Sequence, residues 1–175
     1  LEANPIDAIW PDRPRAPEAP ARAHPLSYAG KPSPEKRAEA AAELRAAGED
    51  AVVLADASAR GLSPLEWAGR VAAQVVSLGA TRVVAEANQG GEMVRTVLAT
   101  AGVDVPIRLV RAFTDKRTRA VPVAALYAQG RVSHAATFAK LEDEMRSFGA
   151  AGFNRSPDRL DALVWAVSDL MLDRG

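Results

Sequence analysis

Three acidic side chains have the types and spacing that a metal-dependent centre requires. Glu86 ends a short apolar run, Val83 to Ala85, which predicts a buried strand. Asp158 and Asp161 are three residues apart at the start of a helical pattern, so they project from neighbouring points of one helix face. Oxygen ligands converging from a strand end and a helix start suit hard ions such as Mg²⁺ or Mn²⁺. Two such ions can activate water for phosphodiester cleavage.

Each of these carboxylates also has a structural interpretation. A carboxylate in the first turn of a helix, such as Asp158, is stabilised by the helix dipole in any protein. A carboxylate at the end of a buried strand, such as Glu86, costs folding free energy unless it is solvated or paired. Arg82 or Arg111 could pair with it. In an α/β pattern, however, ligands bind at the carboxyl ends of the strands, which favours a site at Glu86.

A basic segment lies between the two acidic positions. Its cations are Arg111, Lys116, Arg117 and Arg119. The structural interpretation is that these side chains form a solvent-exposed face of the protein. Beside a nuclease site they could hold DNA phosphates without reading the base sequence.

The elements that must position these residues alternate between strand and helix. Strands are expected at 51–55, 83–85 and 107–110, with a helix from a capping box at Ser63 and Glu66 to Gly79 and another over 91–101. This alternation predicts βαβ units and a mainly parallel sheet. The fold class is therefore α/β.

The last third of the chain is predicted to be mostly helical. A helix through Tyr127 should be kinked or reset by Pro122, a short edge strand should follow at 131–134, and another helix at 138–148. His134 is interpreted as a polar residue at that strand edge. The final helix, from residue 156, has a predicted buried face of Leu160, Leu163, Val164, Val167, Leu170 and Met171.

Composition narrows the class of protein. The chain has 175 residues, 48% of them hydrophobic, and its 22 basic residues balance 22 acidic ones, which argues against a general polyanion binder. It contains no cysteine, so thiolate metal sites and cysteine nucleophiles are excluded. No run is long enough to span a membrane and no phosphate-binding loop occurs, so we expect a cytoplasmic protein without an ATPase motor.

The first 49 residues differ from the rest. Eight of the 12 prolines precede residue 35, where they block helix interiors and central strands. We therefore expect a proline-rich extension with a short helix after Ser33 over residues 1–49, and one domain over 50–175.

Several motifs resemble those of a known family. GATRVVAEANQGGEMVRTVL, PVAALYAQGRVSH, LEDEMRSF and SPDRLDALVWAVSDLML look like the nuclease domain of the large terminase subunit of tailed bacteriophages and gene transfer agents, from about residue 54 onward. The resemblance implies an RNase H-like sheet flanked by helices and a two-metal site with Mg²⁺ or Mn²⁺ that cleaves double-stranded DNA. By position it assigns metal binding to Glu86 and to Asp158 or Asp161. It implies portal protein and the small terminase subunit as partners, in a bacterial host cell.

The chain departs from that family in one respect. Members begin the domain with two further strands, the first ending in a metal-binding aspartate, and neither strand is visible here. Asp56 is the nearest alternative acidic residue. Residues 1–54 instead resemble an interior piece of aminopeptidase P, without the metal-binding residues of that peptidase family. A truncated, inactive remnant that keeps a DNA- or portal-binding surface is therefore the alternative to an active nuclease.

Overall fold

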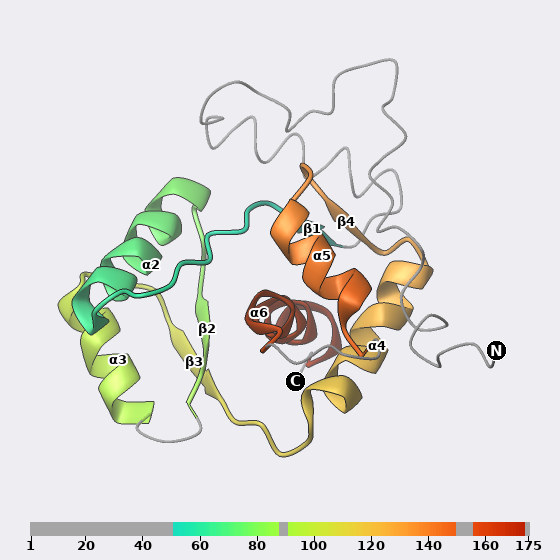
Figure 1. Cartoon of the computed structure of the whole chain (residues 1–175). Coiled ribbons are helices and arrows are strands. Elements are labelled where there is room, and N and C mark those ends of the chain that lie inside the picture. Colours follow the sequence, from blue (N-terminus) through green and yellow to red (C-terminus); the bar gives the residue numbers. More distant parts are fainter. Residues whose placement is uncertain (1–50, 88–90, 150–155, 174–175) are drawn as a thin grey trace. The chain divides into compact units, whose positions relative to one another are not determined.

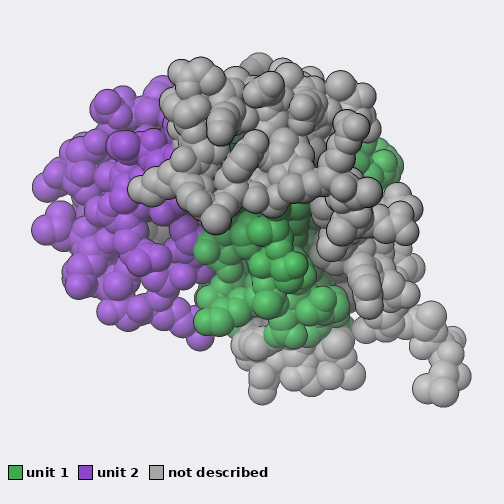
Figure 2. All heavy atoms as spheres, turned by 90° about the horizontal axis from the view of Figure 1, so that it is seen from above, with its two compact units in different colours: residues 1–56, 115–175 green, residues 57–114 purple. Residues whose placement is uncertain are grey.

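The chain divides into two compact units. The structure, a computed structural model, describes residues 51–87, 91–149 and 156–173. Unit 1 comprises residues 1–56 and 115–175, and unit 2 is the continuous segment 57–114 (Figure 2). The predicted proline-rich extension and its short helix lie outside the described residues. The sequence predicted one domain over 50–175, and the described residues of that range belong to both units.

Unit 2 is a parallel β-α-β arrangement preceded by a helix (Figure 1). Its elements are α2 (Pro64–Leu78), β2 (Val83–Glu86), α3 (Gly91–Thr100) and β3 (Ile107–Val110). β2 and β3 run parallel, with Val83 opposite Ile107 and Glu86 opposite Val110. The predicted βαβ unit is confirmed.

Two helices share one core with the β2–β3 sheet. Ala68 of α2 and Leu98 of α3 are buried, and Val83 and Ile107 pack against the same cluster. A Cβ atom on Gly91 would lie 3.1 Å from the Leu109 Cδ1 atom, so glycine allows α3 to start close to β3. The strand predicted as buried is only partly so, because the side chains from Val83 to Ala85 are half-buried.

The start and end of α2 are those that its sequence predicts. The Oε2 atom of Glu66 accepts hydrogen bonds from the backbone N of Ser63 at 2.8 Å and from its hydroxyl at 2.6 Å, the capping-box contact of the glutamate. These hydrogen bonds lower the pKa of Glu66, the one from the serine hydroxyl most strongly. Gly79 ends the helix with φ of 61°, a conformation that favours glycine.

Unit 1 combines a second small parallel sheet with helices. Its elements are β1 (Ala51–Val53), α4 (Lys116–Ala128), β4 (Val132–His134), α5 (Ala139–Ser147), α6 (Asp158–Val167) and the π-helix η1 (Ser168–Leu172). β1 pairs in parallel with β4, with Ala51 opposite Val132 and Val53 opposite His134. The fold class is thus α/β, as predicted.

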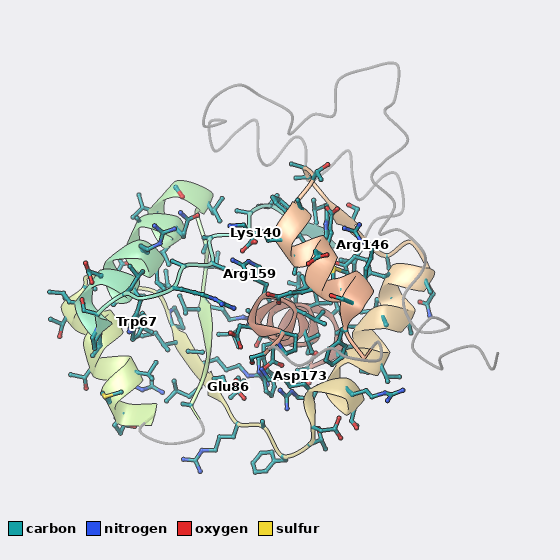
Figure 3. The ribbon with its side chains drawn as sticks, in the orientation of Figure 1. Trp67, Glu86, Lys140, Arg146, Arg159 and Asp173 are labelled. Carbon is teal, nitrogen blue, oxygen red and sulfur yellow. The ribbon has the colours of Figure 1, made fainter. Side chains whose placement is uncertain are left out.

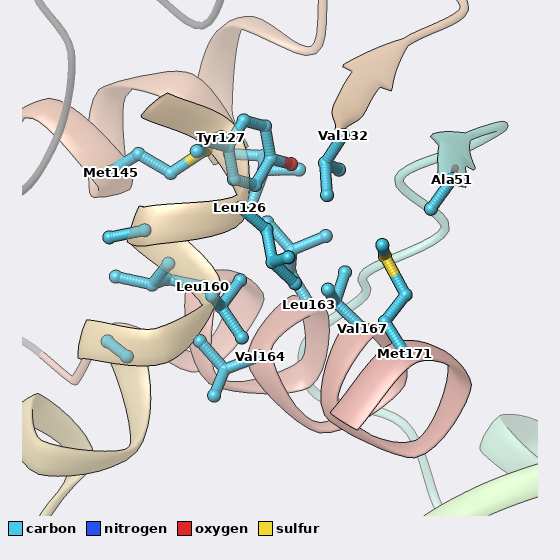
Figure 4. Packing of buried hydrophobic residues seen from close by; sticks show 14 residues of the cluster. Ala51, Leu126, Tyr127, Val132, Met145, Leu160, Leu163, Val164, Val167 and Met171 are labelled. Carbon is cyan, nitrogen blue, oxygen red and sulfur yellow. The ribbon is translucent and has the colours of Figure 1, made fainter. Parts of the chain in front are cut away.

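The core of unit 1 lies mainly between α4 and α6. Leu160 and Val164 of α6 are each 1% exposed and point toward the side of α4 that carries Leu126 and Tyr127 (Figure 4). Val123 of α4 is completely buried in the same cluster. Apolar burial of this kind contributes about 25 cal/mol per Å², so this cluster stabilises unit 1.

One expectation for unit 1 is corrected. Leu170 is 52% exposed although it was predicted to be buried. The reason is the π-helix η1. A π-helix turns through a smaller angle per residue than an α-helix, so Leu170 is rotated out of the buried face and Met171 stays in it. Pro122 lies inside α4, which continues as one helix through it. The predicted edge strand is present as β4 in a two-stranded sheet, and all three of its residues are buried.

No helix in the described ranges is both long enough and apolar enough to cross a lipid bilayer.

Candidate functional site

The two predicted aspartates of α6 differ sharply in environment. The side chain of Asp158 is 62% exposed, and that of Asp161 is 6% exposed. The Oγ atom of Ser156 donates a short hydrogen bond of 2.5 Å to Asp158. The two side chains are neighbours on one face of α6, but Asp161 contacts α4, whereas Asp158, the first residue of α6, is mostly in solvent.

Asp161 is held by two cations of α4. The Nη2 atom of Arg119 donates to Oδ1 at 2.7 Å, and the Nζ atom of Lys116 lies 3.2 Å from Oδ2. The Arg119 side chain is itself only 10% exposed, and its guanidinium carbon lies 4.9 Å from the ring centroid of Trp165. A cation over an indole face is attracted by the ring quadrupole. Arg119 is thus fixed between Trp165 and Asp161.

Lys116 lies among three oxygen-bearing side chains. Besides Asp161, its Nζ atom is 3.2 Å from Ser156 Oγ and 3.7 Å from Asp158 Oδ1. Asp115 caps the helix that carries Lys116 by accepting from Thr118 N at 2.9 Å. That backbone hydrogen bond is the main reason why the pKa of Asp115 is lowered. The start of α4 is therefore well defined.

Glu86 belongs to unit 2 and is an exposed side chain at the carboxyl end of β2. The predicted position of Glu86 at the end of a strand is confirmed, and its side chain is solvated, one of the two states expected for it. Because β2 is parallel to β3, its carboxyl end lies beside that of β3, at Val110. Figure 3 labels this side chain. A solvated carboxylate does not carry the desolvation cost of a buried one.

The four predicted DNA-binding cations have different surroundings. Arg111, in unit 2, and Arg117, on α4, are exposed. Lys116 and Arg119 are engaged with Asp161, as described above. Exposed cations are the ones that can reach phosphate oxygens, so the geometry favours Arg111 and Arg117 for that role.

The sequence prediction missed a buried cluster around His134. Its Nε2 atom is 2.8 Å from the hydroxyl of Tyr127, and its Nδ1 atom is 3.4 Å from Oε1 of Glu142. A carboxylate only accepts hydrogen bonds, so Nδ1 carries the proton and Nε2 accepts from Tyr127. The burial that surrounds the ring lowers the pKa of His134, against the opposing effect of Glu142. Burial also raises the pKa of Tyr127.

This cluster predicts that unit 1 loses stability in mild acid. The pKa of His134 is lowered in the folded state, so the unfolded chain binds the proton more readily. Stability is therefore complete above the ordinary histidine pKa of about 6.5 and falls as the pH drops below it. Urea unfolding at pH 7.5 and 5.5 should show a lower midpoint at pH 5.5.

The control is His134→Gln, which removes the titrating ring. Its midpoint should change less between these two pH values than that of the unchanged chain. An equal change in both proteins would contradict the assignment to His134.

A divalent ion needs several oxygen ligands that can reach it. Glu86 and Asp158 offer exposed carboxylates, whereas Asp161 would have to release Lys116 before one of its oxygens could bind a metal. Over residues 51–87, 91–149 and 156–173, no three His, Cys, Asp or Glu side chains group closely enough to hold a metal ion. Asp161 is therefore an ion-pair partner in this structure, and metal binding by Glu86, Asp158 and Asp161 stays a prediction.

Comparison of the sequence with known families identifies an RNase H-like domain. Residues 41–170 match the sequence model of a family described as the terminase RNaseH-like domain. Since this match covers well over half of the sequence, the chain belongs to that family. Searches of curated proteins and of solved structures found no match.

The family match also bears on the start of the chain. It begins at residue 41, inside the segment that resembles aminopeptidase P. None of the comparisons supports that second resemblance. The residues from 41 to the start of β1 are therefore part of the matched terminase domain, and residues 1–40 and 171–175 lie outside the match.

Proposed function

We propose that this domain cleaves double-stranded DNA in a divalent-metal-dependent reaction during phage-type genome packaging. The observation that carries the proposal is the exposed Glu86 at the carboxyl end of a parallel strand, inside the matched region of a terminase RNaseH-like domain. Glu86, Asp158 and Asp161 are the acidic residues on which cleavage would depend. Bound Mg²⁺ or Mn²⁺ would supply an activated water and stabilise the leaving oxygen.

The partners follow from the same proposal. Double-stranded DNA is the substrate, and the exposed cations Arg111 and Arg117 supply phosphate contacts that do not depend on base sequence. Portal protein and the small terminase subunit are the proposed protein partners, and the bacterial cytoplasm is the proposed location.

A second candidate is a domain that binds DNA or portal protein without cleaving DNA. The observation in its favour is the ion pairing of Asp161, whose two oxygens are both engaged by cations. A carboxylate in this state stabilises the fold whether or not the protein is an enzyme. The Asp56 side chain, the nearest alternative acidic residue, is likewise bonded to Arg159 at 3.1 Å.

Supercoiled plasmid incubated with the purified chain and Mn²⁺ should be converted to nicked and linear forms. Glu86→Ala should reduce this conversion by at least about a hundredfold if the carboxylate is a metal ligand in the reaction. Gel electrophoresis of the plasmid measures the products, and EDTA should stop the reaction.

The matched control is Glu92→Ala, because Glu92 is an exposed glutamate in the first turn of α3 of the same unit. Its nicking rate should equal that of the unchanged chain. If the folded, unchanged chain does not nick plasmid, the cleavage proposal fails. A gel-shift assay with linear DNA then tests the second candidate.

A further inference from the structure

Helix α6 begins without a capping side chain of its own. Its N-cap residue is Pro157, which makes no side-chain hydrogen bond to the helix. The first N–H groups of any α-helix have no partner within the helix and need acceptors from elsewhere. Asp158, in the first turn, has its Oδ1 atom engaged by Ser156. Two N–H groups of this turn find their acceptor on another element.

Glu144 of α5 supplies that acceptor. Its Oε2 atom accepts from the backbone N of Arg159 at 2.9 Å and from the backbone N of Leu160 at 3.2 Å. The side chain of Glu144 is only 4% exposed. A negative charge at a helix N-terminus is favourable because of the helix dipole, and a buried one is retained only when it is well paired. The carboxylate thus caps a helix to which it does not belong.

Arg159 extends the contact to the first strand of unit 1. Its Nη1 atom donates to Glu144 Oε1 at 3.1 Å, and its Nε atom donates to Asp56 Oδ2 at 3.1 Å. Asp56 follows β1 closely in the chain. Arg159 is among the residues labelled in Figure 3. The three side chains therefore join the segment after β1, helix α5 and the first turn of α6.

We propose that Glu144 is a positioning residue for the acidic pair of α6, Asp158 and Asp161. This inference rests on the proposed metal-dependent function. Glu144 fixes the backbone between the two aspartates through Arg159 and Leu160, and Arg159 fixes the same turn relative to β1. Metal ligands that lose an orienting partner typically lose roughly tenfold or more in metal affinity. The inference gives a role to the LEDEMRSF motif, in which Glu144 lies.

The test compares Glu144→Gln with Asp143→Asn in the full 175-residue chain. Asp143 is the preceding residue of α5 and is exposed, so its variant matches the charge change without touching the cap. NMR amide exchange is measured for Arg159 and Leu160. The same samples are titrated with Mn²⁺, and paramagnetic broadening of the first-turn amide signals of α6 gives the half-saturating concentration.

In Glu144→Gln, exchange at Arg159 and Leu160 should rise roughly tenfold or more, because a neutral amide accepts more weakly than a carboxylate. The half-saturating Mn²⁺ concentration should rise by about tenfold. Asp143→Asn should change neither quantity. If Glu144→Gln does not fold, as judged by circular dichroism, Glu144→Asp keeps the charge but shortens the reach, and the same two shifts are expected in it.

Unchanged exchange in the Glu144 variant would overturn the inference. So would faster exchange with unchanged Mn²⁺ binding, because Glu144 would then stabilise the helix without positioning a metal site. Absence of Mn²⁺ broadening in the unchanged chain would count against the proposed metal-dependent function itself, a result distinct from an effect of Glu144.

Discussion

Asp161→Ala is expected to lower the free energy of unfolding of unit 1 by about 3 kcal/mol, the lower end of the range for a broken buried ion pair. The side chains of Asp161 and Arg119 are only 6% and 10% exposed, so the change leaves Arg119 nearly buried without this carboxylate. Lys116 loses the nearer of its two carboxylate neighbours at the same time. Urea denaturation followed by far-UV circular dichroism measures the effect.

Asp158→Ala is the matched control, because it removes the other aspartate of the same helix turn. Its side chain is 62% exposed, and exposed ion pairs contribute at most about 1 kcal/mol. Equal losses in the two variants would contradict the structural role of Asp161. Plasmid nicking by both variants, at a temperature where each is folded, then indicates which aspartate the reaction requires.

Leu160→Ala is expected to cost about 3 kcal/mol of unfolding free energy, within the range for a leucine truncated in a close-packed core. Leu160 is 1% exposed and lies in the cluster between α4 and α6 (Figure 4). The variant leaves a cavity where the side chain packed. Urea denaturation again measures the loss.

Leu170→Ala is the control for this prediction. Because the π-turn of η1 leaves Leu170 52% exposed, its truncation should change the unfolding free energy by less than about 0.5 kcal/mol. A loss as large as that of Leu160→Ala would mean that the α-helical period continues through residue 170, contrary to the structure.

The helices and strands were predicted well, because the start or end of each one depends on a few adjacent residues. The capping box at Ser63 and Glu66, the glycine at 79 and the apolar run before Glu86 are each read from a few adjacent residues. The exposure of Leu170 was not predictable, since a periodicity argument assumes a constant helical pitch. Nor was the division into two units, because it depends on contacts between distant segments.

The contacts of the candidate site residues could not be predicted from local sequence patterns either. The sequence places Glu86 at a strand end and Asp158 and Asp161 in one helix turn, and the structure agrees. What each carboxylate contacts depends on residues far away in the chain. Arg119 lies 42 positions before Asp161. The buried roles of His134 and Glu144 likewise arise from neighbouring helices, which no motif spacing reveals.

The order of the units along the chain has a consequence for folding. Unit 2 is one uninterrupted segment, and its strands pair from Val83 with Ile107. Unit 1 must instead bring Ala51 to Val132, which closes a loop more than three times as long. The longer closure costs about 1 kcal/mol more in chain entropy and slows the search for the native contact. We therefore expect the segment 57–114 to become ordered first and the β1–β4 pairing to form late.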